Sequence, residues 1–384
     1  MKNILKKELC CGCSSCYNAC PKEAITMIED DKGFLYPNIN QNLCIDCKIC
    51  QKVCPVLNTA VNTYQNQAYA CINNNLNIRM NSSSGGIFYL LAKEILSRNG
   101  VVFGAAFNDN FEVSHVMIDN DKDIYKLMGS KYVQSKLNDI FYKVKQQLDL
   151  QKYVLFTGTP CQIEGLKSFL KRNYEKLYTQ DIICHGVPSP LVWKKYIEYR
   201  KNVDKNPPID ISFRNKDNGW KNFNMKFLYK ENFYKKNMQD DLYMTAFLKN
   251  TSLRDSCYNC KFKNNNISSD ITLGDYWGIE YVHSDMFDDK GTSLVIINSS
   301  KGEELFNLIS TKIQYKRTIL NEAIKYNSAY SMPVKVDKKR KKFFKYINEK
   351  SFDKLVKQYS SNSDNIVDTI KRYILKLLKV FHIR

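Results

Sequence analysis

The sequence has no long apolar run, and it is short of acidic residues. No stretch approaches the roughly 18 consecutive apolar residues that a membrane-spanning helix needs, and Met1–Cys10 lacks the apolar core of a signal peptide. These absences exclude a membrane span and predict a cytoplasmic chain, not a secreted disulfide scaffold. With 43% hydrophobic and 25% charged residues over 384 positions, the chain can bury a sizeable core, which excludes a fibrous or disordered protein.

Acidic residues are too few to balance the basic ones. The 58 Lys and Arg residues against 39 Asp and Glu residues give a formal net charge of +19. Part of the excess lies in one run, Lys335–Lys345 (KVDKKRKKFFK). Such a run is most often a solvated segment or an interaction tail. Because no DNA- or RNA-binding motif accompanies it, we do not expect a nucleic-acid partner.

Cysteine is abundant, with 14 residues, and clustered cysteines in a reducing compartment bind metal or do redox chemistry more often than they form disulfides. Residues 10–21 and 44–55 repeat one pattern, C-x2-C-x2-C-x3-C-P. Three cysteines at this spacing wrap one face of a cubane, and the fourth, before the proline, reaches the other cluster. The repeat is typical of a bacterial two-cluster ferredoxin. We therefore predict two 4Fe–4S clusters, the first held by Cys10, Cys13, Cys16 and Cys54 and the second by Cys20, Cys44, Cys47 and Cys50.

A pair of zinc knuckles is the alternative for this block. Zinc is usually satisfied by CxxC pairs and needs neither a third cysteine per motif nor the CxxxCP ending, so the pattern favours iron–sulfur. Cys11 departs from the repeat and is a formal alternative to Cys10, although the spacing favours Cys10. Cys71 lies in an expected strand and is better explained as a small buried hydrophobe than as a ligand. Ala24–Ile28 and Phe34–Tyr36 are expected to form two small strands behind the clusters.

After the cysteine block, strand and helix patterns alternate, which predicts an α/β domain with a mixed sheet. The chain therefore divides into a small ferredoxin-like domain (1–60), a larger α/β domain (61–330) and a basic helical tail (331–384), an α+β and α/β combination. The expected strands are Ala68–Ile72, Val101–Phe107, Val113–Ile118, Tyr153–Thr157, Tyr178–Ile183 and Ser293–Ile297, with further strands in Asn222–Tyr234. The expected helices are Gly86–Arg98, Leu137–Leu150, Gln162–Lys171, Leu191–Arg200 and Gly302–Ser310, with a connection at Asn202–Pro208.

Four more cysteines are dispersed along the α/β domain. Cys161 opens a helix after a strand, where helix N–H groups stabilise a thiolate, and Cys184 ends the next strand. Cys257 and Cys260 form a CxxC pair. The four could complete a third four-thiolate site, or each could have a separate role, as buried cysteines and a lone zinc-binding pair; spacing alone leaves both open.

Several separated motifs occur in a fixed order between about Cys10 and Asn298. They are Ser83-Ser84-Gly85-Gly86, the segment 129–135 (GSKYVQS), Gly158-Thr159-Pro160-Cys161-Gln162, the segment 181–186 (DIICHG), the CxxC pair, and the segment 270–278 (DITLGDYWG). Together they resemble the coenzyme F-420 hydrogenase/dehydrogenase β-subunit family, which includes the plant hydroxymethyl-chlorophyll reductase. The resemblance implies an FAD-binding domain with a nearby 4Fe–4S cluster, and so favours a third cluster at Cys161, Cys184, Cys257 and Cys260.

The resemblance also indicates where the flavin would bind. The Ser84-Gly85-Gly86 stretch opens a helix whose N–H groups could approach a phosphate, although an ordinary capped helix has the same pattern. The implied cofactor-binding residues are Ser83, Ser84, Gly85, Gly86, Ser130, Lys131, Tyr132, Gln134, Thr157, Gly158, Thr159 and Pro160. The candidate catalytic residues are Lys131, His185 and Asp275. Lys131 could contact the diphosphate or a reduced flavin. His185 could equally orient the loop that carries the neighbouring cysteine.

The last residues, Asp364–Arg384, form an amphipathic pattern with Lys and Arg beside an apolar face. This segment could lie peripherally at the inner face of a membrane or dock on the protein's own core.

The function expected from the whole sequence is an iron–sulfur flavoprotein oxidoreductase that exchanges electrons with ferredoxin, a reduced deazaflavin or a catalytic subunit. Some bacterial members of the family are linked to cell-surface polysaccharide synthesis. The alternative is an electron-transfer adaptor without its own substrate.

Overall fold

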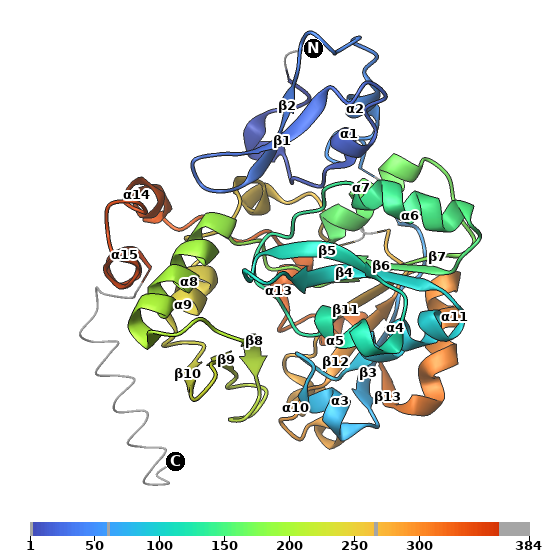
Figure 1. Ribbon diagram of the computed structural model, residues 1–384. Helices are drawn as coiled ribbons and strands as arrows, with labels where there is room; N and C mark the ends of the chain where they lie inside the picture. Colours follow the sequence, from blue (N-terminus) through green and yellow to red (C-terminus); the bar gives the residue numbers. More distant parts are fainter. Residues whose placement is uncertain (1–2, 60–61, 265–267, 361–384) are drawn as a thin grey trace.

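The computed structural model describes residues 3–59, 62–264 and 268–360 (Figure 1). The N-terminal unit is built on an antiparallel hairpin of β1 (Ile25–Glu29) and β2 (Leu35–Ile39), with short helices α1 (Ser15–Asn18) and α2 (Ile49–Lys52) beside it. The hairpin turn needs a glycine: Gly33 has φ +79°, and a Cβ there would lie 2.6 Å from the Leu191 backbone nitrogen. The turn thus packs closely on the next domain.

The centre of the molecule is an eight-stranded mixed sheet, as the alternating pattern predicted. Its order is β13-β3-β12-β11-β7-β6-β4-β5. The inner strands β4, β6, β7 and β11 are parallel, and the remaining pairs are antiparallel. In sheet order the strands are Ile313–Thr318, Gln67–Asn73, Ser293–Ile297, Ile271–Asp275, Leu177–Ile182, Val154–Gly158, Val101–Phe107 and Val113–Ile118.

Helices cover both faces of this sheet because successive strand residues point to opposite sides. Val102, Leu155 and Val295 face one core with α4 (Ile87–Ser97) and α11 (Ser300–Ile309). Val101, Val154 and Phe156 face the other, covered by α6 (Ile140–Asp149) and α7 (Pro160–Leu170). Smaller helices complete the domain: α3 (Leu76–Met80), α5 (Ile124–Leu127), α10 (Ile279–Val282), α12 (Leu320–Ala323) and α13 (Ser328–Ser331).

A second, three-stranded sheet lies beside the central domain (Figure 1). It contains β8 (Asp210–Asn215), β9 (Asn224–Leu228) and β10 (Phe233–Asn237), packed with α8 (Pro190–Asp204) and α9 (Leu242–Leu248). The helix expected to end at Arg200 continues to Asp204, since the Arg200 guanidinium pairs with that carboxylate one turn later. The connection expected from Asn202 therefore starts later.

The described part of the basic C-terminal region joins this same core. Helices α14 (Arg340–Lys345) and α15 (Phe352–Tyr359) bury Phe343, Phe344 and Phe352 against it, while Lys341, Lys342 and Lys345 remain exposed. The run of lysines is thus the solvated side of a packed segment. The amphipathic pattern at 364–384 lies outside the described residues. Among those that are described, no helix has the length and apolarity to cross a membrane.

Candidate iron–sulfur and flavin sites

Each half of the N-terminal unit surrounds a cavity with four of the predicted cysteines. One cavity is lined by Cys10, Cys13, Cys16 and Cys54, and we call it the first site. The other is lined by Cys20, Cys44, Cys47 and Cys50, and we call it the second site. The exchange of the fourth cysteine between repeats is the one that the spacing predicted. Cys47 is exposed, so the second site lies closest to solvent.

The local backbone explains why the two halves look alike. Ser14 and Lys48 both have φ 59° and begin the single-turn helices α1 and α2. These left-handed residues turn the chain between the second and third cysteine of each repeat. The helix then carries the chain to the fourth cysteine, which lies beside the other cavity.

A third site gathers the four dispersed cysteines from three regions of the α/β domain. Cys161 lies at the start of α7, Cys184 follows β7, and Cys257 and Cys260 lie at the 3-10 turn Asp255–Asn259. All four line one cavity. Burial raises the pKa of the Cys184 thiol and raises that of Cys257 to about 12, with the neighbouring cysteines adding to the shift. Thiolates are therefore stable here only with a compensating cation, as a metal cluster supplies.

The cysteines of each set line a cavity and do not form a tight group of ligands. Four thiolates around one zinc ion lie about 3.8 Å apart, as the Zn–S bond length and tetrahedral geometry require. In the part of the chain that the structure describes, no three His, Cys, Asp or Glu side chains form a group that could hold a single metal ion. The sulfurs of each set instead border a cavity, which fits a four-iron cluster.

Cys11 lies between the first and third sites. It lines both cavities, and its thiol is within hydrogen-bonding reach of Cys13 and of Cys161. Helix α7 also lies close to the first site, since a Cβ at Gly165 would be 3.0 Å from the Cys13 sulfur. The first and third sites are therefore neighbours, whereas the second and third cavities share no lining residue.

The flavin residues implied by the resemblance fall into two groups. In the first group, Ser83 and Ser130 meet directly: the Ser130 backbone N–H and hydroxyl both donate to the Ser83 hydroxyl, at 2.7 and 2.9 Å. The next residue, Lys131, donates to the Met128 and Gly129 carbonyls and makes no ion pair among the described residues. Burial lowers the pKa of Lys131 to about 7. A desolvated amine without a carboxylate partner fits the neighbourhood of an anionic group.

The glycines of the 83–86 loop are used for close packing. The Gly85 N–H donates to the Ser293 hydroxyl at 2.9 Å, and a Cβ on Gly85 would lie 2.8 Å from the Ser293 nitrogen. Gly86 has φ +83° and begins α4. The Gly85 N–H therefore already has a partner within the protein.

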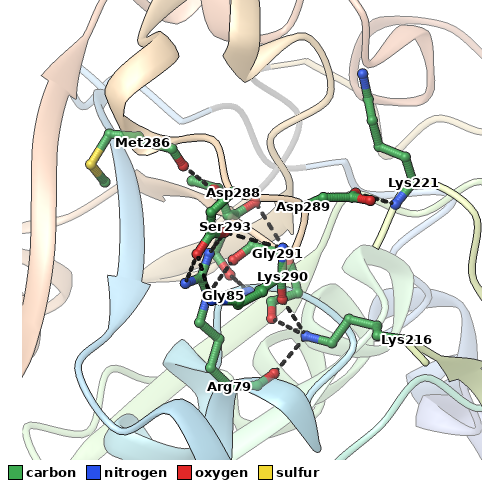
Figure 2. A network of polar contacts seen from close by, with 12 residues as sticks. Arg79, Gly85, Lys216, Lys221, Met286, Asp288, Asp289, Lys290, Gly291 and Ser293 are labelled. Carbon is green, nitrogen blue, oxygen red and sulfur yellow. Dashed lines mark hydrogen bonds and ion pairs between the residues drawn. The ribbon is translucent and has the colours of Figure 1, made fainter. Parts of the chain in front are cut away.

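Figure 2 shows what holds this loop in place. Lys216, which follows β8, donates to the carbonyls of Arg79, Ser84 and Lys290 at 2.5, 3.0 and 2.7 Å. Arg79 in turn pairs with Asp288. Sequence reasoning missed Lys216, because nothing in a lysine between strands signals a buried role.

The second group of implied flavin residues faces other parts of the chain. Gln134 contacts the N-terminal unit, where its Nε2 donates to the Cys11 carbonyl. Tyr132 stacks on Phe247 with ring centroids 4.6 Å apart. Thr157 and Gly158 end β6, and Thr159 caps α7 through a capping box with Gln162. Pro160 is the first residue of α7 and lines the third cavity.

The remaining catalytic candidates, His185 and Asp275, both have structural partners. His185 lines the third cavity, and its Nε2 donates to the Asn250 side-chain oxygen at 2.7 Å. Burial lowers the pKa of His185. Both Asp275 oxygens accept hydrogen bonds, from the Arg214 guanidinium at 2.6 and 3.2 Å and from the Trp220 indole at 2.9 Å. Such a carboxylate is better suited to anchoring a loop than to taking up a proton.

The fold and the cysteine sites define an iron–sulfur protein in which a ferredoxin-type unit is joined to an α/β domain. Comparison with known proteins agrees. Residues 9–58 match the 4Fe–4S dicluster domain, and residues 151–321 match the C-terminal region of the coenzyme F420 hydrogenase/dehydrogenase beta subunit family. The chain therefore carries the C-terminal domain of this family of oxidoreductases behind an N-terminal dicluster domain with two 4Fe–4S clusters.

Individual relatives resemble parts of the chain. The coenzyme F420-dependent sulfite reductase of Methanocaldococcus jannaschii is 24% identical over 206 residues, which cover 51% of this chain and 31% of that protein. An uncharacterised ferredoxin of the same organism is 36% identical over 52 residues, 14% of this chain and 66% of the ferredoxin. The chain thus spans about a third of the reductase and about two thirds of the ferredoxin. A chain of the F420-reducing [NiFe] hydrogenase complex from Methanosarcina barkeri aligns with a TM-score of 0.49 at 17% identity, over 70% of this chain and 88% of that one.

Proposed function

We propose that this protein is an iron–sulfur flavoprotein oxidoreductase with three 4Fe–4S clusters and one FAD. The observation that supports the proposal most directly is the adjacency of the first and third cysteine sites, which share Cys11 and Val56 as lining residues. Clusters in these sites would pass single electrons between the α/β domain and the exposed second site. Flavin supplies the conversion between two-electron and one-electron chemistry.

The residues of the chain have distinct parts in this proposal. Cys161, Cys184, Cys257 and Cys260 hold the third cluster, and His185 orients the loop after Cys184 through its bond to Asn250. Ser83, Ser130 and Lys131 hold the anionic part of the flavin, because they supply hydroxyls and a desolvated amine in one place. Thr159 lies beside the third cysteine site, with its hydroxyl oxygen 3.2 Å from the Cys161 sulfur.

The electron partner is a reduced deazaflavin, a ferredoxin or a catalytic subunit. The similarity to a coenzyme F420-dependent sulfite reductase favours the deazaflavin as the first coenzyme to test. None of these relatives points to polysaccharide synthesis, so that setting stays a prediction from the sequence.

Anaerobic purification followed by iron, sulfide, zinc and flavin counts tests the proposal. About twelve irons and one FAD per chain are expected, because each cluster holds four irons. A Cys257→Ser variant should hold about eight irons. The control Cys71→Ser removes a buried cysteine that lines none of the three cavities, and it should keep about twelve. Wild-type protein with eight irons would refute the third cluster. Full iron without flavin, and no turnover of a reduced deazaflavin, would leave the adaptor function instead.

A further inference from the structure

Arg254 is the largest charged side chain that is completely buried among residues 3–59, 62–264 and 268–360. Its exposed fraction is 0%, and it precedes the third-site cysteine Cys257 by three residues. No carboxylate pairs with it among the described residues. The adjacent Asp255 is engaged elsewhere, with Lys32 at 3.0 Å and Arg340 at 2.7 Å.

The hydrogen bonds of Arg254 all end on neutral groups. Nε donates to the Cys10 carbonyl at 2.7 Å, and the two terminal nitrogens donate to the Gln134 side-chain oxygen at 2.9 Å and to the Leu35 carbonyl at 3.0 Å. The guanidinium also lies 4.1 Å from the centroid of the Tyr36 ring. These contacts give each of the three nitrogens an acceptor, but they do not neutralise the charge.

The position of the guanidinium indicates which groups would balance its charge. It lies against the chain between Cys10 and Cys13, since a Cβ at Gly12 would be 2.9 Å from its Nη1. It donates to the Cys10 carbonyl, and Gln134 links it to the Cys11 carbonyl. The charges of Cys10, Tyr36, Cys11 and Cys257 raise the pKa of Arg254, and the three cysteines belong to or border the first and third sites. A 4Fe–4S cluster with four thiolates carries a charge of about −2, so two such clusters would surround this cation.

We infer that Arg254 is the shared counter-ion of the first and third clusters and raises the reduction potential of both. The inference rests on the proposed presence of the third cluster. Each cluster that accepts one electron gains one negative charge, and a buried cation stabilises the reduced state more than the oxidised state. The second cluster, whose cavity shares no lining residue with the third, should respond much less.

Redox titration of the purified holoprotein, followed by electron paramagnetic resonance, tests this role. Cys257→Ser and Cys47→Ser variants assign the signals of the third and second clusters. In Arg254→Gln, the ratio of reduced to oxidised first and third clusters at a fixed potential should fall at least tenfold, or about 59 mV for a one-electron couple. The second cluster should change less than twofold.

Two further variants separate the charge from its structural surroundings. Gln134→Glu keeps Arg254 and places a carboxylate where the Gln134 oxygen now accepts its hydrogen bond, at 2.9 Å. Because this carboxylate balances the charge of the guanidinium, the reduction potentials of the first and third clusters should fall. This variant tests the charge even if Arg254→Gln does not fold. Arg340→Gln is the matched control: Arg340 is also buried and bonds the Leu253 carbonyl, but it is paired with Asp255, so the potentials should not move.

The outcomes are distinct from those of the proposed function. Wild-type protein with eight irons would remove the third cluster, and the shared role with it. Twelve irons together with ratios within twofold of the wild type in both Arg254→Gln and Gln134→Glu would refute the counter-ion alone. Equal shifts of all three clusters, or a shift in Arg340→Gln, would refute it too.

Discussion

Replacing Asp275 tests whether this residue anchors the fold or handles protons. Its carboxylate is paired with Arg214, whose side chain is 5% exposed, and it also accepts from Trp220. Asp275→Ala therefore leaves a buried guanidinium without its partner. Removing one member of a buried ion pair costs about 3–5 kcal/mol. We expect the free energy of unfolding to fall by about that amount.

The charges around the pair add to this cost. Burial lowers the pKa of Lys216 to about 7, and Arg79 and Arg214 lower it further, while Asp275 and Asp288 raise it. Without Asp275, one of the two carboxylates that raise the pKa of Lys216 is lost, while Arg79 and Arg214 remain. Asp275→Asn keeps the shape and one acceptor, so its loss of stability should be smaller than that of alanine but still measurable.

Urea unfolding under anaerobic conditions, followed by circular dichroism, measures these differences at equal cluster content. Asp285→Asn is the control, since Asp285 pairs with Lys316 on the surface at 55% and 46% exposure; surface pairs contribute about 1 kcal/mol or less. An Asp275→Asn protein as stable as the wild type that has lost turnover would contradict the anchoring role and support proton transfer.

Two other predictions concern a pH dependence and the C-terminus. Because the pKa of Lys131 is about 7 in the folded protein and about 10.4 in an unfolded chain, the unfolded state binds an extra proton between these values. Stability should therefore rise with pH across this window in the wild type and rise less in Lys131→Met; identical pH profiles in flavin-free protein would refute the burial of this amine. For the amphipathic segment at 364–384, deletion after Ser360 should abolish binding to anionic liposomes in a flotation assay, and unchanged binding would dispose of the membrane hypothesis.

The mixed sheet and the N-terminal cysteine unit could be predicted because their signals are local. Alternating apolar strands and helices indicated the sheet, and the C-x2-C-x2-C-x3-C-P repeat determined which cysteines share a cavity. The strands β8, β11 and β13 were missed. The tail was predicted to be helical, but only tertiary packing decides that Phe343 and Phe352 are buried in the core.

The third site and its surroundings were harder to infer from the sequence. Cys161, Cys184 and the CxxC pair are brought together by the topology of the sheet, which spacing does not encode. Buried cations gave no signal at all: Arg254 and Lys216 look like surface residues in the sequence, and their roles follow only from the carbonyls that they meet. Gln134 shows the converse, as a residue of the implied flavin motif that contacts the N-terminal unit.

Helix α7 has a consequence for how the protein can move. Cys161 and Gly165 are four residues apart, which is about 6 Å along a helix axis. The first turn of this helix carries a third-site cysteine, and Gly165, one turn later, lies against Cys13. Hinge motion between the two domains would have to break that contact, so one helical turn fixes the spacing between the first and third cysteine sites.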